Sequence, residues 1–103
     1  MSRISNTDAF FTAQKNVTTS GTPEALASHT IPDGAKLIVK AKTGNTGTIT
    51  VGNSSANALN SGTAHVKLAQ NQSLELQVIN SASVWIDATV SGEGVEYFSE
   101  AHA

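Results

Sequence analysis

Hydrophobic and polar residues alternate along most of the chain after residue 35. Successive side chains of a β-strand point to opposite faces, so this alternation is typical of strands that have one buried face. No window shows the period of about 3.6 residues that an amphipathic helix requires. The pattern predicts strands over residues 36–42, 48–52, 64–68, 73–78, 84–90 and 94–100.

Residues typical of turns separate these strands, at intervals of roughly 8–20 residues that suit a sandwich or barrel better than alternating strands and helices. Two short stretches, "TPEALAS" (22–28) and "SSANALN" (54–60), fit a helical turn. The first also fits a short edge strand, which is the interpretation we favour. The chain is therefore predicted to be all-β, as a single antiparallel β-sandwich or a jelly-roll-like barrel.

The first twenty residues differ from the rest because Phe10 and Phe11 stand as bulky residues in a polar segment. Alternation allows only one of two adjacent side chains to face the core of its own domain. We therefore expect residues 1–20 to form an extended N-terminal arm that docks on a neighbour, or an outer strand, and residues 21–103 to form the β-sandwich domain. Removal of an arm should leave that domain folded.

A glycine-rich loop, "TGNTG" (43–47), follows the strand predicted at residues 36–42. A phosphate-binding loop would be followed by a helix and by a lysine next to serine or threonine. Here the β-branched run "TITVG" follows instead. We predict a tight antiparallel hairpin in which Gly44, Asn45 and Gly47 adopt positive φ.

Charge and composition exclude several classes of function. The 103 residues carry a net charge of −2, without the basic surface that nucleic-acid binding requires. Lys36, Lys40 and Lys42 alternate on one strand, which we interpret as a solvated face whose lysines protect a sheet edge. The chain has no cysteine, so disulfides and thiolate metal sites are excluded.

The sequence also lacks targeting and membrane signals. The start "MSRISNTDAFF" has no apolar core of a signal peptide, and no apolar run approaches the roughly 20 residues that span a bilayer. We expect synthesis in a cytoplasm and no membrane partner.

Residue types that carry catalytic or metal chemistry are present but not grouped. His29, His65 and His102 have no second ligand at metal-binding spacing, and we expect them to be solvated. The carboxylates are scattered, and no GxSxG motif supports a catalytic serine. We predict no enzymatic activity, no metal and no cofactor.

Trp85 is the candidate for a binding residue. Alternation places Trp85 on one strand face with Asp87 and Thr89, opposite Val84 and Ile86. An aromatic ring beside a carboxylate can form a platform for a sugar or anchor a protein interface. A third possibility is that the N-terminal arm covers Trp85.

Four segments together resemble small all-β structural proteins of tailed bacteriophages, namely head decoration (cement) proteins and tail or fibre accessory domains. These segments are "GTPEAL", "IPDGAKLIVKAKTGNTGTITVG", "LAQNQSLELQV" and "VWIDATVSGEGVEYFSE". The resemblance spans roughly residues 20–100 and is carried by turn and strand motifs. It implies a virion component that forms oligomers and contacts other capsid or tail subunits, without catalytic residues.

The function expected from these observations is capsid decoration. The protein is expected to bind the major capsid protein or other virion subunits and to reinforce the head. We expect it to act as a homo-oligomer, with a trimer favoured. The alternative is a tail-fibre or baseplate domain that binds host surface carbohydrate. Aromatic residues and one neighbouring carboxylate are expected to form the partner interface: Phe10, Phe11, Trp85, Asp87, Tyr97 and Phe98.

Overall fold

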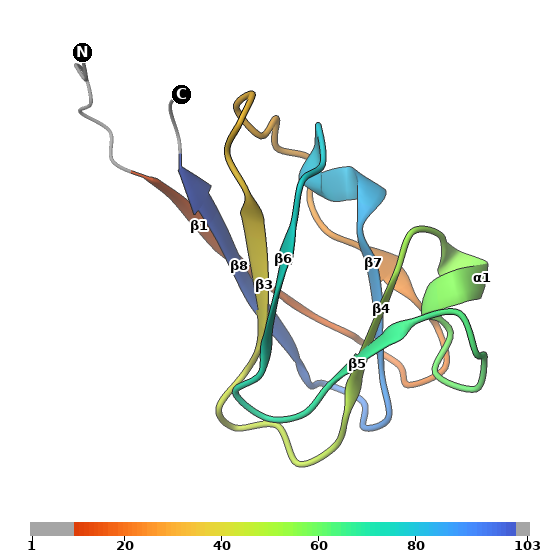
Figure 1. Cartoon of the computed structure of the whole chain (residues 1–103). Coiled ribbons are helices and arrows are strands. Elements are labelled where there is room, and N and C mark those ends of the chain that lie inside the picture. Colours follow the sequence, from red (N-terminus) through yellow and green to blue (C-terminus); the bar gives the residue numbers. More distant parts are fainter. Residues whose placement is uncertain (1–9, 101–103) are drawn as a thin grey trace.

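The computed structural model describes residues 10–100, which form two antiparallel sheets packed face to face (Figure 1). In the described part of the chain each sheet has four strands. The first sheet has the order β1 (Phe10–Asn16), β8 (Gly94–Glu100), β3 (Leu37–Ala41), β6 (Ser73–Leu76). The second has the order β2 (Glu24–Ala25), β7 (Trp85–Ala88), β4 (Ile49–Gly52), β5 (Val66–Leu68). The predicted antiparallel β-sandwich is confirmed.

The core lies between the two sheets and is built from the inward positions of the alternating strands. Leu37 and Val39 from the first sheet, and Ile49 and Ile86 from the second, are 0% exposed. Two sheets packed this way interdigitate their inner side chains into a layer about 10 Å thick. The short strand predicted within residues 22–28 is also confirmed, because β2 forms one edge of the second sheet.

The glycine-rich loop crosses between the sheets, so the predicted hairpin is wrong. It joins β3 in the first sheet to β4 in the second, and these strands do not pair with each other. Each of the two strands has an apolar face, and these faces pack against the shared core from its two opposite sides. Gly44, Asn45 and Gly47 do not adopt positive φ. The side-chain amide of Asn45 instead donates to the carbonyl of Gly94 (2.8 Å) and fixes the crossing.

The position of β3 also corrects the interpretation of the lysines. β3 lies between β8 and β6, so it is an inner strand of the first sheet. Lys40 points outward from this strand, but it protects no sheet edge.

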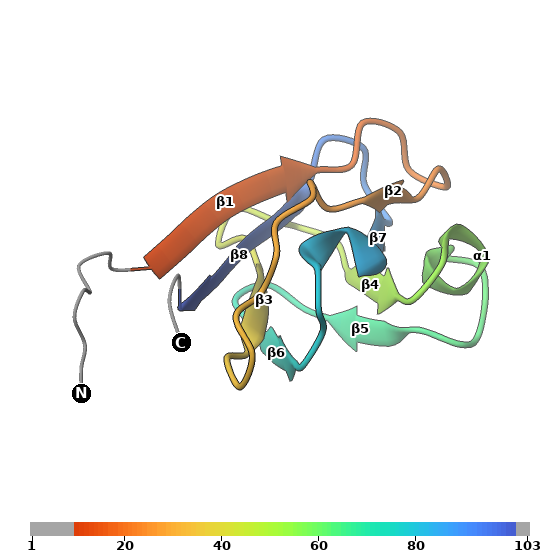
Figure 2. The same cartoon turned by 90° about the horizontal axis from the view of Figure 1, so that it is seen from above.

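A short helix, α1 (Ser55–Ala58), adds a partial third layer on the outer face of the second sheet (Figure 2). This confirms the helical turn predicted within residues 54–60. Ser54 caps the helix by accepting from the backbone N–H of Asn57 (3.1 Å). The hydroxyl of Thr50 on β4 donates to the carbonyl of Ala58 (2.5 Å). Gly52 permits this close approach, because a Cβ there would lie 2.6 Å from the backbone nitrogen of Ala58.

The described part of the N-terminal segment contains an outer strand of the sandwich. β1 pairs along its whole length with β8, from Phe10 opposite Glu100 to Asn16 opposite Gly94. Val17, directly after β1, is 0% exposed. Removal of residues 1–20 would therefore remove a strand and a core residue, contrary to the expectation that the domain would stay folded. Residues 1–9 lie outside the described residues.

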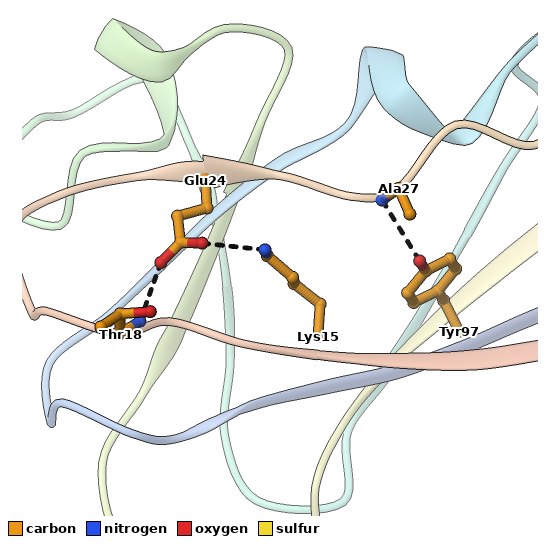
Figure 3. Close-up of polar contacts among 5 residues, drawn as sticks. All are labelled: Lys15, Thr18, Glu24, Ala27 and Tyr97. Atoms are coloured by element: carbon orange, nitrogen blue, oxygen red, sulfur yellow. Dashed lines mark hydrogen bonds and ion pairs between the residues drawn. The ribbon is translucent and has the colours of Figure 1, made fainter.

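Polar contacts close the sandwich on the side where β1 and β2 lie (Figure 3). The ammonium of Lys15 on β1 lies 2.8 Å from the carboxylate of Glu24 on β2. The same carboxylate accepts from the backbone N–H of Thr18 (2.8 Å). Hydrogen bonding to Lys15, followed by that from Thr18, lowers the pKa of Glu24 below its ordinary value of 4.5.

Candidate interaction surface

The outer face of the first sheet carries three large apolar side chains that we call the outer aromatic patch: Phe10, Ile38 and Phe98. Phe98 on β8 lies opposite Ile38 on β3, so the two are direct cross-strand neighbours. Phe10, at the start of β1, is 62% exposed. Together with residues 34–36 and Ser99, the patch lines a shallow depression of about 510 Å³.

Phe98 also borders a second depression on the same face, of about 610 Å³. This one is lined mainly by polar side chains, including Gln14, Lys40 and Glu96. Lys40 lies opposite Glu96 in the strand register. The face therefore places an apolar patch beside a polar strip that carries both signs of charge.

This arrangement is suited to binding another protein. Exposed aromatic side chains flanked by polar residues are typical of protein interfaces. Over residues 10–100, no group of three or more histidine or carboxylate side chains could hold a metal ion.

The structure brings together Phe10 and Phe98 from the predicted interface, but it turns Tyr97 and Phe11 inward. Tyr97 is 1% exposed, and its hydroxyl accepts from the backbone N–H of Ala27 at 3.3 Å (Figure 3). Phe11 is half-buried and stacks on the ring of His29, with 3.7 Å between ring centroids. The expected exposure of Tyr97 is therefore wrong, and His29 is half-buried where full solvation was expected, because both residues help to close the β1–β2 side of the sandwich.

Asp87 does not lie on an exposed face either, and this is a correction to the predicted interface. It is 0% exposed, although it points away from the core between the sheets. One carboxylate oxygen accepts from the backbone N–H groups of Gly21 (3.0 Å) and Ala88 (2.8 Å), and the other accepts from that of Asn60 (2.8 Å). The segment that contains α1 covers this position, which the alternation of the strand does not reveal.

Trp85 lies on β7, in the second sheet, away from the outer aromatic patch. Its strand neighbours are Ala25 and Gly52, and its side chain is half-buried. Because Asp87 is enclosed by backbone donors, its carboxylate does not join Trp85 in a sugar platform at the surface.

Ile38 is the member of the patch that sequence reasoning missed. Ile38 lies between Lys36 and Lys40 on the outward side of its strand, and no role is predicted for it from the sequence. The signal was available, since an isoleucine among outward-facing lysines is an apolar residue placed where solvent is expected.

The backbone N–H groups of the glycine-rich loop bind a carboxylate of the same chain, that of Glu93. The carboxylate of Glu93 accepts from the backbone N–H groups of Thr46 (2.7 Å) and Gly47 (2.9 Å). The N–H groups of Thr46 and then Gly47 lower the pKa of Glu93 below its ordinary value of 4.5. These loop amides are therefore occupied by an internal partner.

No protein-family model, curated protein or solved structure matches this chain. Over the described residues, no helix has the length and apolar character needed to cross a membrane. The fold and the surface thus define the molecule as a small β-sandwich with a partly exposed apolar patch on one sheet.

Proposed function

We propose that the protein is a structural subunit of a bacteriophage particle, and that its outer aromatic patch docks on a neighbouring virion subunit. The observation that carries the docking role is the cluster of exposed Phe10 with half-buried Ile38 and Phe98 on the outer face of the first sheet. The phage assignment is supported by the resemblance of the four sequence segments. The particular role proposed is capsid decoration, with the major capsid protein as the partner. The protein would attach to the capsid as a homo-oligomer, with a trimer favoured.

The energetics suit a protein that acts in many copies. Full burial of one phenylalanine contributes about 1.5–3 kcal/mol, so a patch of three apolar side chains gives modest affinity for each copy. Contacts repeated over a lattice gain strength through effective concentration. A decoration layer of this kind would reinforce a shell against internal pressure.

Attachment to particles tests this function. Phe10→Ser removes the most exposed member of the patch, and Val90→Ser is a matched control because Val90 is an exposed apolar residue (41%) outside the patch. Purified variants would be added to particles that lack the protein, and binding would be measured by co-sedimentation. We expect Phe10→Ser to bind at least about tenfold more weakly, which corresponds to 1.4 kcal/mol, and Val90→Ser to bind normally.

Equal binding of the two variants would contradict the role of the patch. Particles without the protein are expected to assemble and then release DNA at a lower temperature than complete particles. Equal heat stability of the two kinds of particle would contradict the decoration role.

A further inference from the structure

A groove lies on the side of the sandwich opposite to the β1–β2 contacts, between β5 and β6. We call it the edge groove. It has a volume of about 490 Å³, and six of its lining residues are valines or leucines: Val51, Val66, Leu74, Leu76, Val78 and Val84. Both sheets contribute to its walls, since β5 and β6 are edge strands of different sheets.

The backbone of β6 faces outward along this groove. Within residues 10–100, β6 pairs with β3 on one side and with no strand on the other. The N–H of Ala41 donates to the carbonyl of Gln72 (2.9 Å), and bonded pairs alternate along an antiparallel ladder. The backbone groups of Ser73 and Glu75 therefore point away from β3, at the spacing of a further strand.

Charge and hydrogen bonding restrict what the groove accepts. No Asp, Glu, Lys or Arg is among its lining residues in the described part of the chain. The Nδ1 atom of His65, a lining residue, is buried and finds no hydrogen-bond partner among the described residues. An occupant must therefore be uncharged where it enters the groove, and it must supply backbone donors and acceptors along β6.

We propose that the edge groove binds an extended, uncharged peptide segment of a partner protein, which adds to β6 as a new strand. Alternate apolar side chains of the segment would enter the groove while its backbone pairs with that of Ser73 and Glu75. A second copy could also pair along β6, and the Lys36 ammonium 3.4 Å from each Glu75 carboxylate would offset the repulsion between the two carboxylates. Dimerisation through β6 is therefore an outcome that the experiment has to distinguish. This inference concerns a different surface from the outer aromatic patch and does not depend on it.

The test is a titration of the ¹⁵N-labelled full chain with a probe peptide, acetyl-Ser-Val-Thr-Val-Ser-Val-amide, followed by NMR. We expect shifts of the Ser73 and Glu75 amides and of the His65 ring, and slower hydrogen exchange of the two amides. The same peptide N-methylated at alternate residues cannot form the ladder and should cause none of these changes. The absence of shifts at millimolar probe, or equal binding of the methylated peptide, would overturn the proposal.

Two variants locate the binding. Glu75→Pro removes an outward N–H, while Glu75→Gln removes the same charge and keeps that N–H. We expect Glu75→Pro to weaken probe binding by at least about tenfold and Glu75→Gln to leave it unchanged. Val66→Ser, at an exposed groove position (46%), should also weaken binding. Normal binding by folded Glu75→Pro, or a wild-type chain that dimerises through β6 and leaves the probe unbound, would overturn the proposal.

Discussion

The carboxylate of Asp87 accepts a hydrogen bond from the backbone N–H of Asn60, 2.8 Å away. Asp87 lies on the outer face of β7, and Asn60 follows α1, so this bond joins the second sheet to the segment that covers it. The side-chain amide of Asn60 extends the connection by donating to the carbonyl of Ala88 (2.8 Å). A residue that alternation places toward solvent thus becomes the centre of a buried polar network.

Asp87→Asn is expected to lower the free energy of unfolding by about 2–3 kcal/mol. The substitution replaces a charged acceptor of three backbone N–H groups with an amide that has one acceptor oxygen, so a buried donor is left unpaired. Urea denaturation measures the loss. Asp33→Asn, at an exposed turn position, is the matched control and should change stability little. Equal stability of the two variants would show that the Asp87 network contributes nothing.

Gly52→Ala is expected to destabilise the protein by about 1–3 kcal/mol, because the added methyl group overpacks the contact between β4 and α1. The nearest atoms are backbone atoms of Asn57 and Ala58, which cannot rotate away. Gly44→Ala is the control, since nothing lies within 4 Å of its Cβ position. Thermal unfolding should separate the two, and a Gly52→Ala variant as stable as Gly44→Ala would contradict the close packing of α1.

The fold class could be predicted because local pattern and global architecture agree along the core strands. In β3, Leu37, Val39 and Ala41 are all 0% exposed, as their alternation with outward residues indicates. The sheet to which each strand belongs could not be predicted in the same way. Alternation shows which face of a strand is buried, but it does not show which other strands pair with it. The loop between β3 and β4 was therefore mistaken for a hairpin.

The candidate site could be predicted only in part, for a related physical reason. Phe10 and Phe98 were both assigned to a partner interface, and they share one surface. Asp87 and Tyr97 were misplaced because the outcome depends on distant segments: residues near Asn60 and Gly21 cover Asp87, and Ala27 binds the hydroxyl of Tyr97. Contacts over such sequence separations leave no periodic signal.

Removal of residues 1–20 is expected to unfold the sandwich or to leave only a small part of its free energy of unfolding. That free energy is about 5–15 kcal/mol for a typical domain. The deletion would leave β8 as an unprotected edge and expose the core beside Val17. Circular dichroism during heating measures the effect. Removal of residues 1–9 is the control, because it keeps β1 intact, and the effect of the longer deletion is judged against it. A cooperative transition at the wild-type temperature after the longer deletion would contradict the structural role of β1.

Stability is expected to fall in acid because of two carboxylates, Glu24 and Glu93. Both have pKa values below the ordinary value of 4.5 in the folded protein, so folding favours their charged forms. Their contribution is fully present above about pH 4.5, and it is lost as the pH falls from there through the lowered pKa values. Chemical denaturation across this range should show a decrease that becomes smaller in Glu24→Gln and in Glu93→Gln.

Lys15→Met provides a sharper test of the cause at Glu24. Lys15 makes the largest contribution to the lowered pKa of Glu24, so its removal should return that pKa toward 4.5 and reduce the acid dependence. The backbone N–H of Thr18 remains as a donor, so some dependence should persist. The double variant Lys15→Met/Glu24→Gln should then lose less stability at pH 7 than the sum of the single variants, because both remove the same interaction. If the stability losses of the two single variants simply add up in the double variant, the ion pair between Lys15 and Glu24 does not stabilise the contact between β1 and β2.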